Sequence, residues 1–98
     1  MNMQAILKQA QNMQKDMLKI KGEIDNTVFT GESSIIKVEV FGSKKVKSVK
    51  INAENNIEKD EIDMLEDMIT IAMNSALEKI DKTTEEKMGK FGNIPGMF

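Results

Sequence analysis

The sequence contains no cysteine, histidine, arginine, tryptophan or tyrosine among its 98 residues. Without cysteine the chain can form no disulfide and offers no thiolate, and without histidine it lacks the usual neutral-pH base and metal ligand. Most enzyme mechanisms depend on one of these groups. We therefore expect no enzymatic activity, no small-molecule substrate, no cofactor and no metal site.

Long apolar runs are also missing, because no segment approaches the roughly 18 consecutive residues that a membrane span requires. The N-terminal residues mix glutamine and lysine with apolar residues, unlike a secretory signal. The composition, 40% hydrophobic and 31% charged, is typical of a globular protein. We expect one small soluble domain in the cytoplasm, without a membrane partner. A core of this size is only marginally stable alone, which favours self-association.

All 14 basic residues are lysine. Arginine supplies the usual bidentate contact to guanine edges, whereas lysine acts mainly as a point charge, so we expect any nucleic-acid contact to have low sequence specificity. The four phenylalanines are not interleaved with the lysines, which disfavours the stacking surfaces that bind single strands. Double-stranded DNA is therefore the better target.

The charge is distributed unevenly, although the net charge is only −2. Residues 1–50 carry nine lysines against five acids, a balance of +4, whereas residues 51–98 carry five against eleven, a balance of −6. Seven of those eleven acids lie between Glu54 and Asp67, where the start of a helix would favour carboxylates. The first half of the chain is thus the part suited to phosphates.

A long amphipathic helix is predicted from Met3 to Ile24. Its apolar residues recur at alternating steps of three and four: Met3, Ile6, Ala10, Met13, Met17, Ile20 and Ile24. This heptad seam is typical of a helix that packs against another helix. The helix is about 33 Å long, whereas a compact chain of this length has a radius of gyration of about 13 Å. We expect part of the seam to pack against a second copy or to project as an arm; the alternative is a helix lying across its own sheet. The predicted homodimer interface comprises Ile6, Ala10, Met13, Met17, Ile20 and Ile24.

Residues 27–52 change to a period of two, which predicts a three-stranded antiparallel sheet with one apolar face. The first strand is expected to be short and to turn at Gly31. The apolar face of the next two strands comprises Ile36, Val38, Val40, Val49 and Ile51. Val46 breaks the alternation, which indicates either a β-bulge near the turn or a strand that starts later.

A second helix is predicted to begin at Asp60, which would cap it, with Asp63 in a capping-box-like position. Its core stripe comprises Ile62, Leu65, Ile69, Ala72, Ala76 and Ile80. Glycine and proline beyond Met88 cannot sustain a helix. We therefore expect a single α+β domain over residues 1–88 and a flexible tail over residues 89–98.

Two groups of lysines are candidate DNA-binding residues, because a lysine surface can neutralise backbone phosphates. The first group, on the helix side opposite the seam, is Lys8, Lys15 and Lys19. The second group, in and after the hairpin turn, is Lys44, Lys45, Lys47 and Lys50. The alternative is that both are solvated faces that keep a methionine-rich protein soluble.

Five short segments occur in the order found in the YbaB/EbfC family of bacterial nucleoid-associated proteins, and the chain resembles that family over nearly its whole length. The segments are Lys8–Gln14, Thr30–Ser33, Lys37–Val38, Leu65–Asp67 and Ala72–Ala76. The resemblance implies an α-β-β-β-α protomer, an intertwined or tweezer-like homodimer and DNA binding by the dimer. Family members often have a longer connection after the second segment, so a tight first hairpin is expected here.

The predicted function is that of a nucleoid-associated protein that binds double-stranded DNA as a homodimer, mainly through phosphates and with low sequence specificity, in the cytoplasm at the nucleoid. The first alternative is a protein-interaction adaptor without a direct DNA role. A second is a carboxylate metalloenzyme built on Glu61, Asp63, Glu66 and Asp67. Because no EF-hand glycine pattern accompanies these acids, a solvated helix start is preferred.

Overall fold

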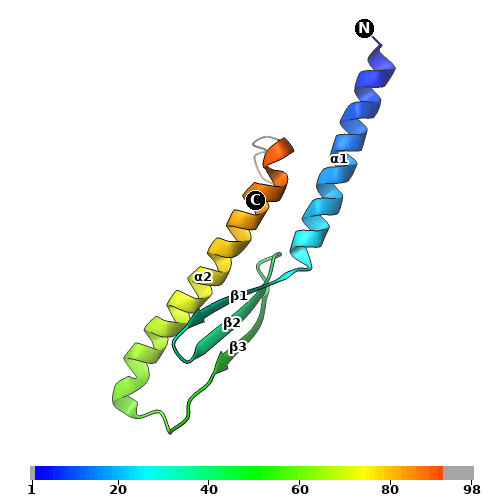
Figure 1. The fold of residues 1–98 in the computed structure, drawn as a ribbon. Helices are drawn as coiled ribbons and strands as arrows, with labels where there is room; N and C mark the ends of the chain where they lie inside the picture. The colour runs from blue at the N-terminus through cyan, green and yellow to red at the C-terminus, as the bar shows by residue number, and fades with distance from the viewer. Residues whose placement is uncertain (1, 92–98) are drawn as a thin grey trace.

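The chain folds in the order helix, three strands, helix (Figure 1). The computed structural model describes residues 2–91. The elements are α1 (Met3–Asp25), β1 (Val28–Ser33), β2 (Ile36–Phe41), β3 (Val46–Ile51), a 3-10 turn (Lys59–Glu61), α2 (Ile62–Met88) and a second 3-10 turn (Gly89–Phe91). This α-β-β-β-α order confirms the predicted α+β class. No helix in the described part of the chain combines the length and apolarity needed to cross a membrane.

Helix α1 projects beyond the rest of the molecule, and we refer to it as the arm (Figure 1). Asn2 caps its first turn, because Asn2 Oδ1 accepts a hydrogen bond from the Gln4 N–H at 3.0 Å. The molecule measures 71 × 19 × 16 Å and has a radius of gyration of 19.3 Å, against about 13 Å for a compact chain of this length. The projecting arm is therefore observed, and the alternative of a helix lying across its own sheet is wrong.

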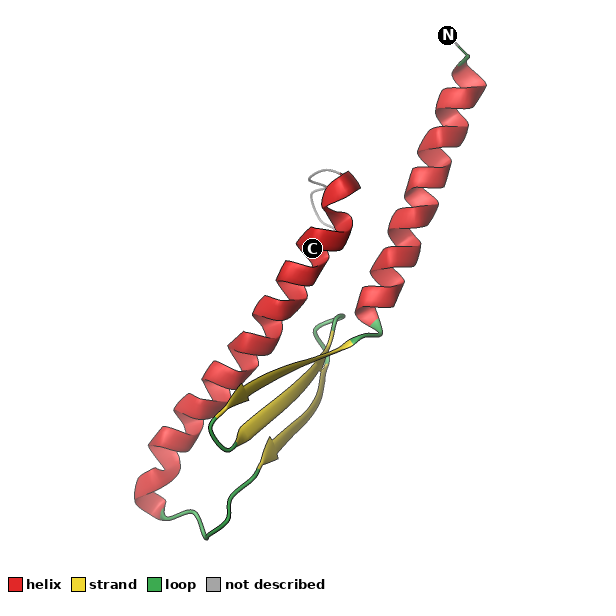
Figure 2. Cartoon of the chain, in the orientation of Figure 1, coloured by secondary structure: helices red, strands yellow, loops and turns green. Residues whose placement is uncertain are grey.

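The strands form an antiparallel sheet in the order β1-β2-β3, and α2 lies along one face of it (Figure 2). Alternate residues of β2 face this helix: Ile36, Val38 and Val40 are buried in one cluster with Ala72 and Ala76. The two alanines let the helix approach the sheet closely. The predicted apolar face of the second strand is confirmed.

Strand β1 does not turn at Gly31, as the sequence suggested, but continues to Ser33. A Cβ atom on Gly31 would overlap the carbonyl oxygen of Ala72 and lie 2.7 Å from the backbone nitrogen of Ala76. Glycine is thus needed here for close contact between strand and helix. The reversal comes afterwards, where Ser34 has a positive φ of 52° and Ser33 pairs with Ile36, so the expected tight hairpin is confirmed.

The irregularity at Val46 is a β-bulge, which decides between the two alternatives left open by the sequence. Glu39 pairs with Ser48, but Val40 pairs with Val46, so Lys47 is the extra residue on β3. The bulge restores Val46 to the side of the sheet that Val40 occupies. It follows a turn in which Lys44 has a φ of 73°.

The start of α2 differs from the prediction. Asp60 does not cap the helix but lies inside the 3-10 turn, and the Glu61 N–H donates to the Glu58 carbonyl at 3.0 Å. Because Glu61, the residue before the helix, already has helical backbone angles and makes no side-chain cap, the extended conformation that a capping residue needs is absent. Ile62, assigned to the core stripe, is exposed at this end of the helix.

A second core lies where the C-terminal ends of the two helices meet. Met17 and Ile24 of α1 pack there with Met88 of α2, and Phe91 joins them from the last 3-10 turn. The segment predicted to be a flexible tail, residues 89–98, thus begins with an ordered turn. The rest of that segment lies outside the described residues.

Candidate nucleic-acid interface

The predicted dimer seam on the arm divides into two halves. The half nearest the sheet is buried or half-buried within the protomer and consists of Met17, Ile20 and Ile24. The outer half is exposed and consists of Ile6, Ala10 and Met13. With 44% of Ile6 and 45% of Met13 accessible, the outer half presents an apolar surface to solvent. The inner half is occupied by packing within the chain.

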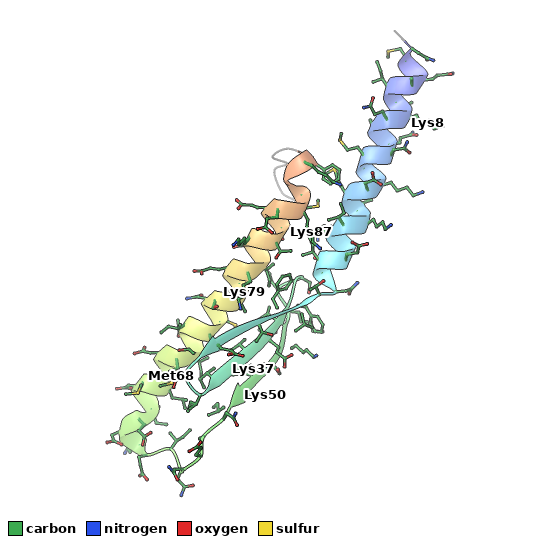
Figure 3. All side chains as sticks on the ribbon, viewed as in Figure 1. Lys8, Lys37, Lys50, Met68, Lys79 and Lys87 are labelled. Carbon is green, nitrogen blue, oxygen red and sulfur yellow. The ribbon has the colours of Figure 1, made fainter. Side chains whose placement is uncertain are left out.

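The first lysine group lies on the arm. Lys8, Lys15 and Lys19 are exposed, and helix periodicity places them opposite the seam. None of the three forms an ion pair with any residue between 2 and 91. Lys8 lies toward the outer end of the arm (Figure 3), and the three span about 16 Å along the helix axis. Phosphates recur every 3.4 Å or so along one DNA strand, so the group can reach several.

The second lysine group does not form one surface. Lys44 Nζ lies 3.7 Å from Asp81 Oδ1 of α2, whereas Lys47 Nζ lies 4.0 Å from Glu39 Oε2 of β2. All four lysines are exposed, but Lys45 and Lys50 form no ion pair with any residue between 2 and 91. The sequence grouped these lysines because they are close in the chain, but the turn and the bulge direct them to different neighbours.

An open pocket of about 220 Å³ lies where the arm, the β2–β3 turn and α2 meet. Two lysines line it, and each is paired with an aspartate. The Lys21 and Asp25 side chains lie 3.0 Å apart, and Lys44 lies near Asp81 as described. Since its lysines are already matched by carboxylates, this pocket offers little to attract a phosphate.

The outer face of the sheet, turned away from α2, brings Lys50 of the second predicted lysine group beside Lys37, which the sequence pattern did not assign to DNA. Lys37 of β2 is exposed and pairs directly with Lys50 of β3, and Figure 3 shows the two on neighbouring strands. Beside them Ser48 Oγ donates a 2.9 Å hydrogen bond to Glu39 Oε1. The cross-strand register is what brings these groups together. The alternation of β2 by itself places Lys37 on the face opposite the buried residues.

The Glu39 carboxyl has a lowered pKa. The hydrogen bond from Ser48 is the main cause; burial opposes it, and the nearby positive charges of Lys47, Lys50 and Lys37 each lower the pKa further. Glu39 is therefore ionised at neutral pH. Its charge offsets part of the lysine charge on this face.

Strand β3 carries an apolar strip that the described part of the chain covers only in part. Val49 pairs with Val38 and Ile51 with Ile36, so both share the face on which α2 lies. Yet α2 packs on β1 and β2, and Val46, Val49 and Ile51 keep between 43% and 45% of their surface exposed. The sequence predicted this face but not its partial exposure.

The acids around the start of α2 are exposed along the helix surface. Among residues 2–91 no three acids come close enough to hold a metal ion together. Carboxylates at this position instead complement the positive end of the α2 dipole.

These features define a small α+β protein with a projecting helical arm, lysines as its sole basic residues, and exposed apolar side chains on the arm and on β3. The model of the YbaB/EbfC DNA-binding family matches residues 1–94. The chain belongs to this family.

Similar proteins from three bacteria are each named nucleoid-associated protein. The protein of Ligilactobacillus salivarius is 43% identical over 100 residues, which cover 99% of this chain and 95% of that protein. The protein of Lactococcus lactis subsp. cremoris is 45% identical over 93 residues, 93% of each chain. The protein of Streptococcus thermophilus is 41% identical over 98 residues, 97% of this chain and 98% of its own. The family assignment therefore extends over nearly the full length.

A solved structure shares the fold. The crystal structure of an uncharacterized protein from Helicobacter pylori superposes with a TM-score of 0.73, covering 95% of this chain and 99% of that one, at 11% sequence identity. The common α-β-β-β-α arrangement is thus retained where few residues are shared.

Proposed function

We propose that this protein is a nucleoid-associated protein of the cytoplasm that binds double-stranded DNA as a homodimer, without enzymatic activity. Most of the affinity comes from lysine contacts to phosphates, and discrimination between duplex sequences is low. The observation that carries the proposal is the arm, which presents three exposed lysines on the side opposite an apolar seam whose outer half is exposed. Membership of a DNA-binding family and the names of the relatives support it.

The homodimer is supported by apolar surface that the protomer leaves exposed. The outer half of the seam and the β3 strip together place several large apolar side chains in solvent, and a patch of this kind marks an association site. A second copy can cover both surfaces at once, since each copy supplies an arm and a strip. In such a dimer the arm lysines stay outside the interface and face the DNA.

Low sequence specificity follows from the chemistry of the lysines. A lysine ammonium binds a phosphate as a point charge but does not form the paired contacts by which arginine reads guanine. Because the phosphate contacts are electrostatic, the binding constant K should fall steeply as the salt concentration rises. Each phosphate neutralised should make the slope of log K against log salt steeper by about 0.9.

The proposal is tested by replacing the three arm lysines, Lys8, Lys15 and Lys19, with glutamine and measuring duplex binding by fluorescence anisotropy at several salt concentrations. The wild type should bind unrelated duplexes with similar affinity. The triple variant should bind more weakly, with a slope flatter by about one for each phosphate that it no longer neutralises.

A matched control changes three exposed lysines elsewhere, Lys59, Lys82 and Lys87, to glutamine. Both variants lose the same charge, so the control should keep most of the wild-type slope. Equal flattening in the two variants would show that net charge alone, and not the arm, governs binding.

The second candidate function is a protein-interaction adaptor. Its supporting observation is the first part of α2, where Met64 and Ile71 are exposed on one helix face among acidic residues. Such a surface suits a basic amphipathic partner. Failure of the wild type to bind any duplex at low salt would favour this function over DNA binding.

A further inference from the structure

The outer face of the sheet brings together positively charged residues that are separated in the sequence. Lys37 and Lys50 are direct cross-strand partners on this exposed face. Like charges placed opposite each other in a sheet are destabilising, so the pair costs stability unless an anion lies between the two ammonium groups. A phosphate oxygen is an anion that two such groups can share.

The β-bulge adds a third cation to this face. In a regular strand, Lys47 would alternate with Ser48 and point toward the α2 side. As the extra residue of the bulge, Lys47 instead reaches the outer face, where its Nζ lies 4.0 Å from Glu39 Oε2. Three lysines from two strands therefore surround one carboxylate.

Glu39 is held firmly in the midst of these lysines. Ser48 donates to it at 2.9 Å, and 19% of its side chain is accessible. A carboxylate fixed in this way competes with an incoming phosphate for the same ammonium groups. Glu32, the other acid on this face, pairs with Lys37 from β1 but is exposed and makes no ion pair shorter than 4.0 Å with a described residue.

We infer that the outer face of the sheet is a second phosphate-binding surface for duplex DNA, formed by Lys37, Lys47 and Lys50, and that Glu39 weakens it by neutralising part of their charge. The inference rests on the proposed DNA binding and extends it to a surface separate from the arm. Lys8 lies toward the far end of the arm, whereas Lys37 and Lys50 lie on the sheet (Figure 3).

The test is the substitution Glu39→Gln, which keeps an oxygen that can accept the Ser48 hydrogen bond but removes the charge. The control is Glu78→Gln on an exposed position of α2, which changes the net charge equally. Anisotropy with a mixed-sequence duplex should show E39Q binding roughly three- to tenfold tighter than wild type, with a salt slope steeper by up to about 1 per protomer. E78Q should stay within about twofold of wild type. Equal behaviour of E39Q and E78Q would overturn the inference.

A second comparison assigns any gain to the sheet. Adding Lys37→Gln and Lys50→Gln to E39Q should abolish the tighter binding, whereas adding Lys59→Gln and Lys82→Gln should not. A gain that survives loss of Lys37 and Lys50 would overturn the inference, since the lysines that the carboxylate masks would then lie elsewhere. Thermal unfolding of every variant checks that the fold is retained.

The two proposals fail in different ways. If the wild type and E39Q both leave every duplex unbound at low salt, the proposed function and this inference fail together. If the wild type binds and E39Q behaves as E78Q does, only the inference fails.

Discussion

Gly31 is a residue at which strand β1 lies in close contact with helix α2. It has no φ that demands glycine, yet a single added carbon would overlap the Ala72 carbonyl. Gly22 offers the opposite case, because nothing lies within 4 Å of the position its Cβ would occupy and it sits inside a helix. The two glycines therefore separate the cost of crowding from the cost of a flexible backbone.

Gly31→Ala should lower the free energy of unfolding by about 2 to 3 kcal/mol, because α2 must move off the sheet to admit the methyl group. Gly22→Ala should raise it by about 0.5 to 1 kcal/mol, since alanine loses less entropy in a helix. Urea unfolding followed by circular dichroism measures both. Similar stability of the two variants would contradict the close contact at Gly31.

The Glu39 carboxyl links stability to pH. Its folded-state pKa lies below the ordinary value of 4.5, so its stabilising effect is fully present above pH 4.5 and is lost as the pH falls through the lowered pKa. The urea midpoint of the wild type should therefore decrease with acid in this range. Glu39→Gln should decrease less over the same range. Parallel curves for the two proteins would show that Glu39 does not contribute to this pH dependence.

The arm combines two roles in one continuous helix. Its inner half belongs to the core with Met88, while its outer half extends into solvent with a regular apolar seam. A uniform heptad pattern thus covers two different environments. Substitutions in the two halves should consequently have different effects.

Met17→Asp should reduce the free energy of unfolding by roughly 3 kcal/mol, because it places an unpaired charge in the buried junction. Met13→Asp should leave the protomer folded but disrupt the proposed dimer. Thermal unfolding and multi-angle light scattering measure these two effects. A Met13→Asp variant that remains dimeric would remove the outer seam from the interface.

The elements themselves were largely predictable because each has a strong period. The heptad seam located α1, and the alternation of Ile36, Val38 and Val40 located β2 and its buried face. Properties that depend on a neighbouring element were not predictable. The sequence predicts a turn at Gly31 because glycine serves equally in turns and in close contacts. It predicts a cap at Asp60 because residue type does not reveal backbone conformation.

The candidate site was only partly predictable for the same reason. Helix periodicity alone places the arm lysines on one side, so they could be grouped from the sequence. The association of Lys37, Lys50 and Glu39 depends on strand register and on a bulge. The arm seam is buried only where the C-terminal end of α2 packs against it. No local sequence pattern shows which seam residues that end of α2 will reach.

The whole molecule is nearly four times as long as it is wide, at 71 × 19 × 16 Å. A particle of this shape meets more hydrodynamic friction than a sphere of equal mass. Even a single protomer should therefore leave a gel-filtration column early, at a volume where a heavier compact protein would elute. Because of the projecting arm, a single protomer should have the apparent size of an oligomer in any experiment that measures diffusion. Light scattering, in contrast, measures mass directly.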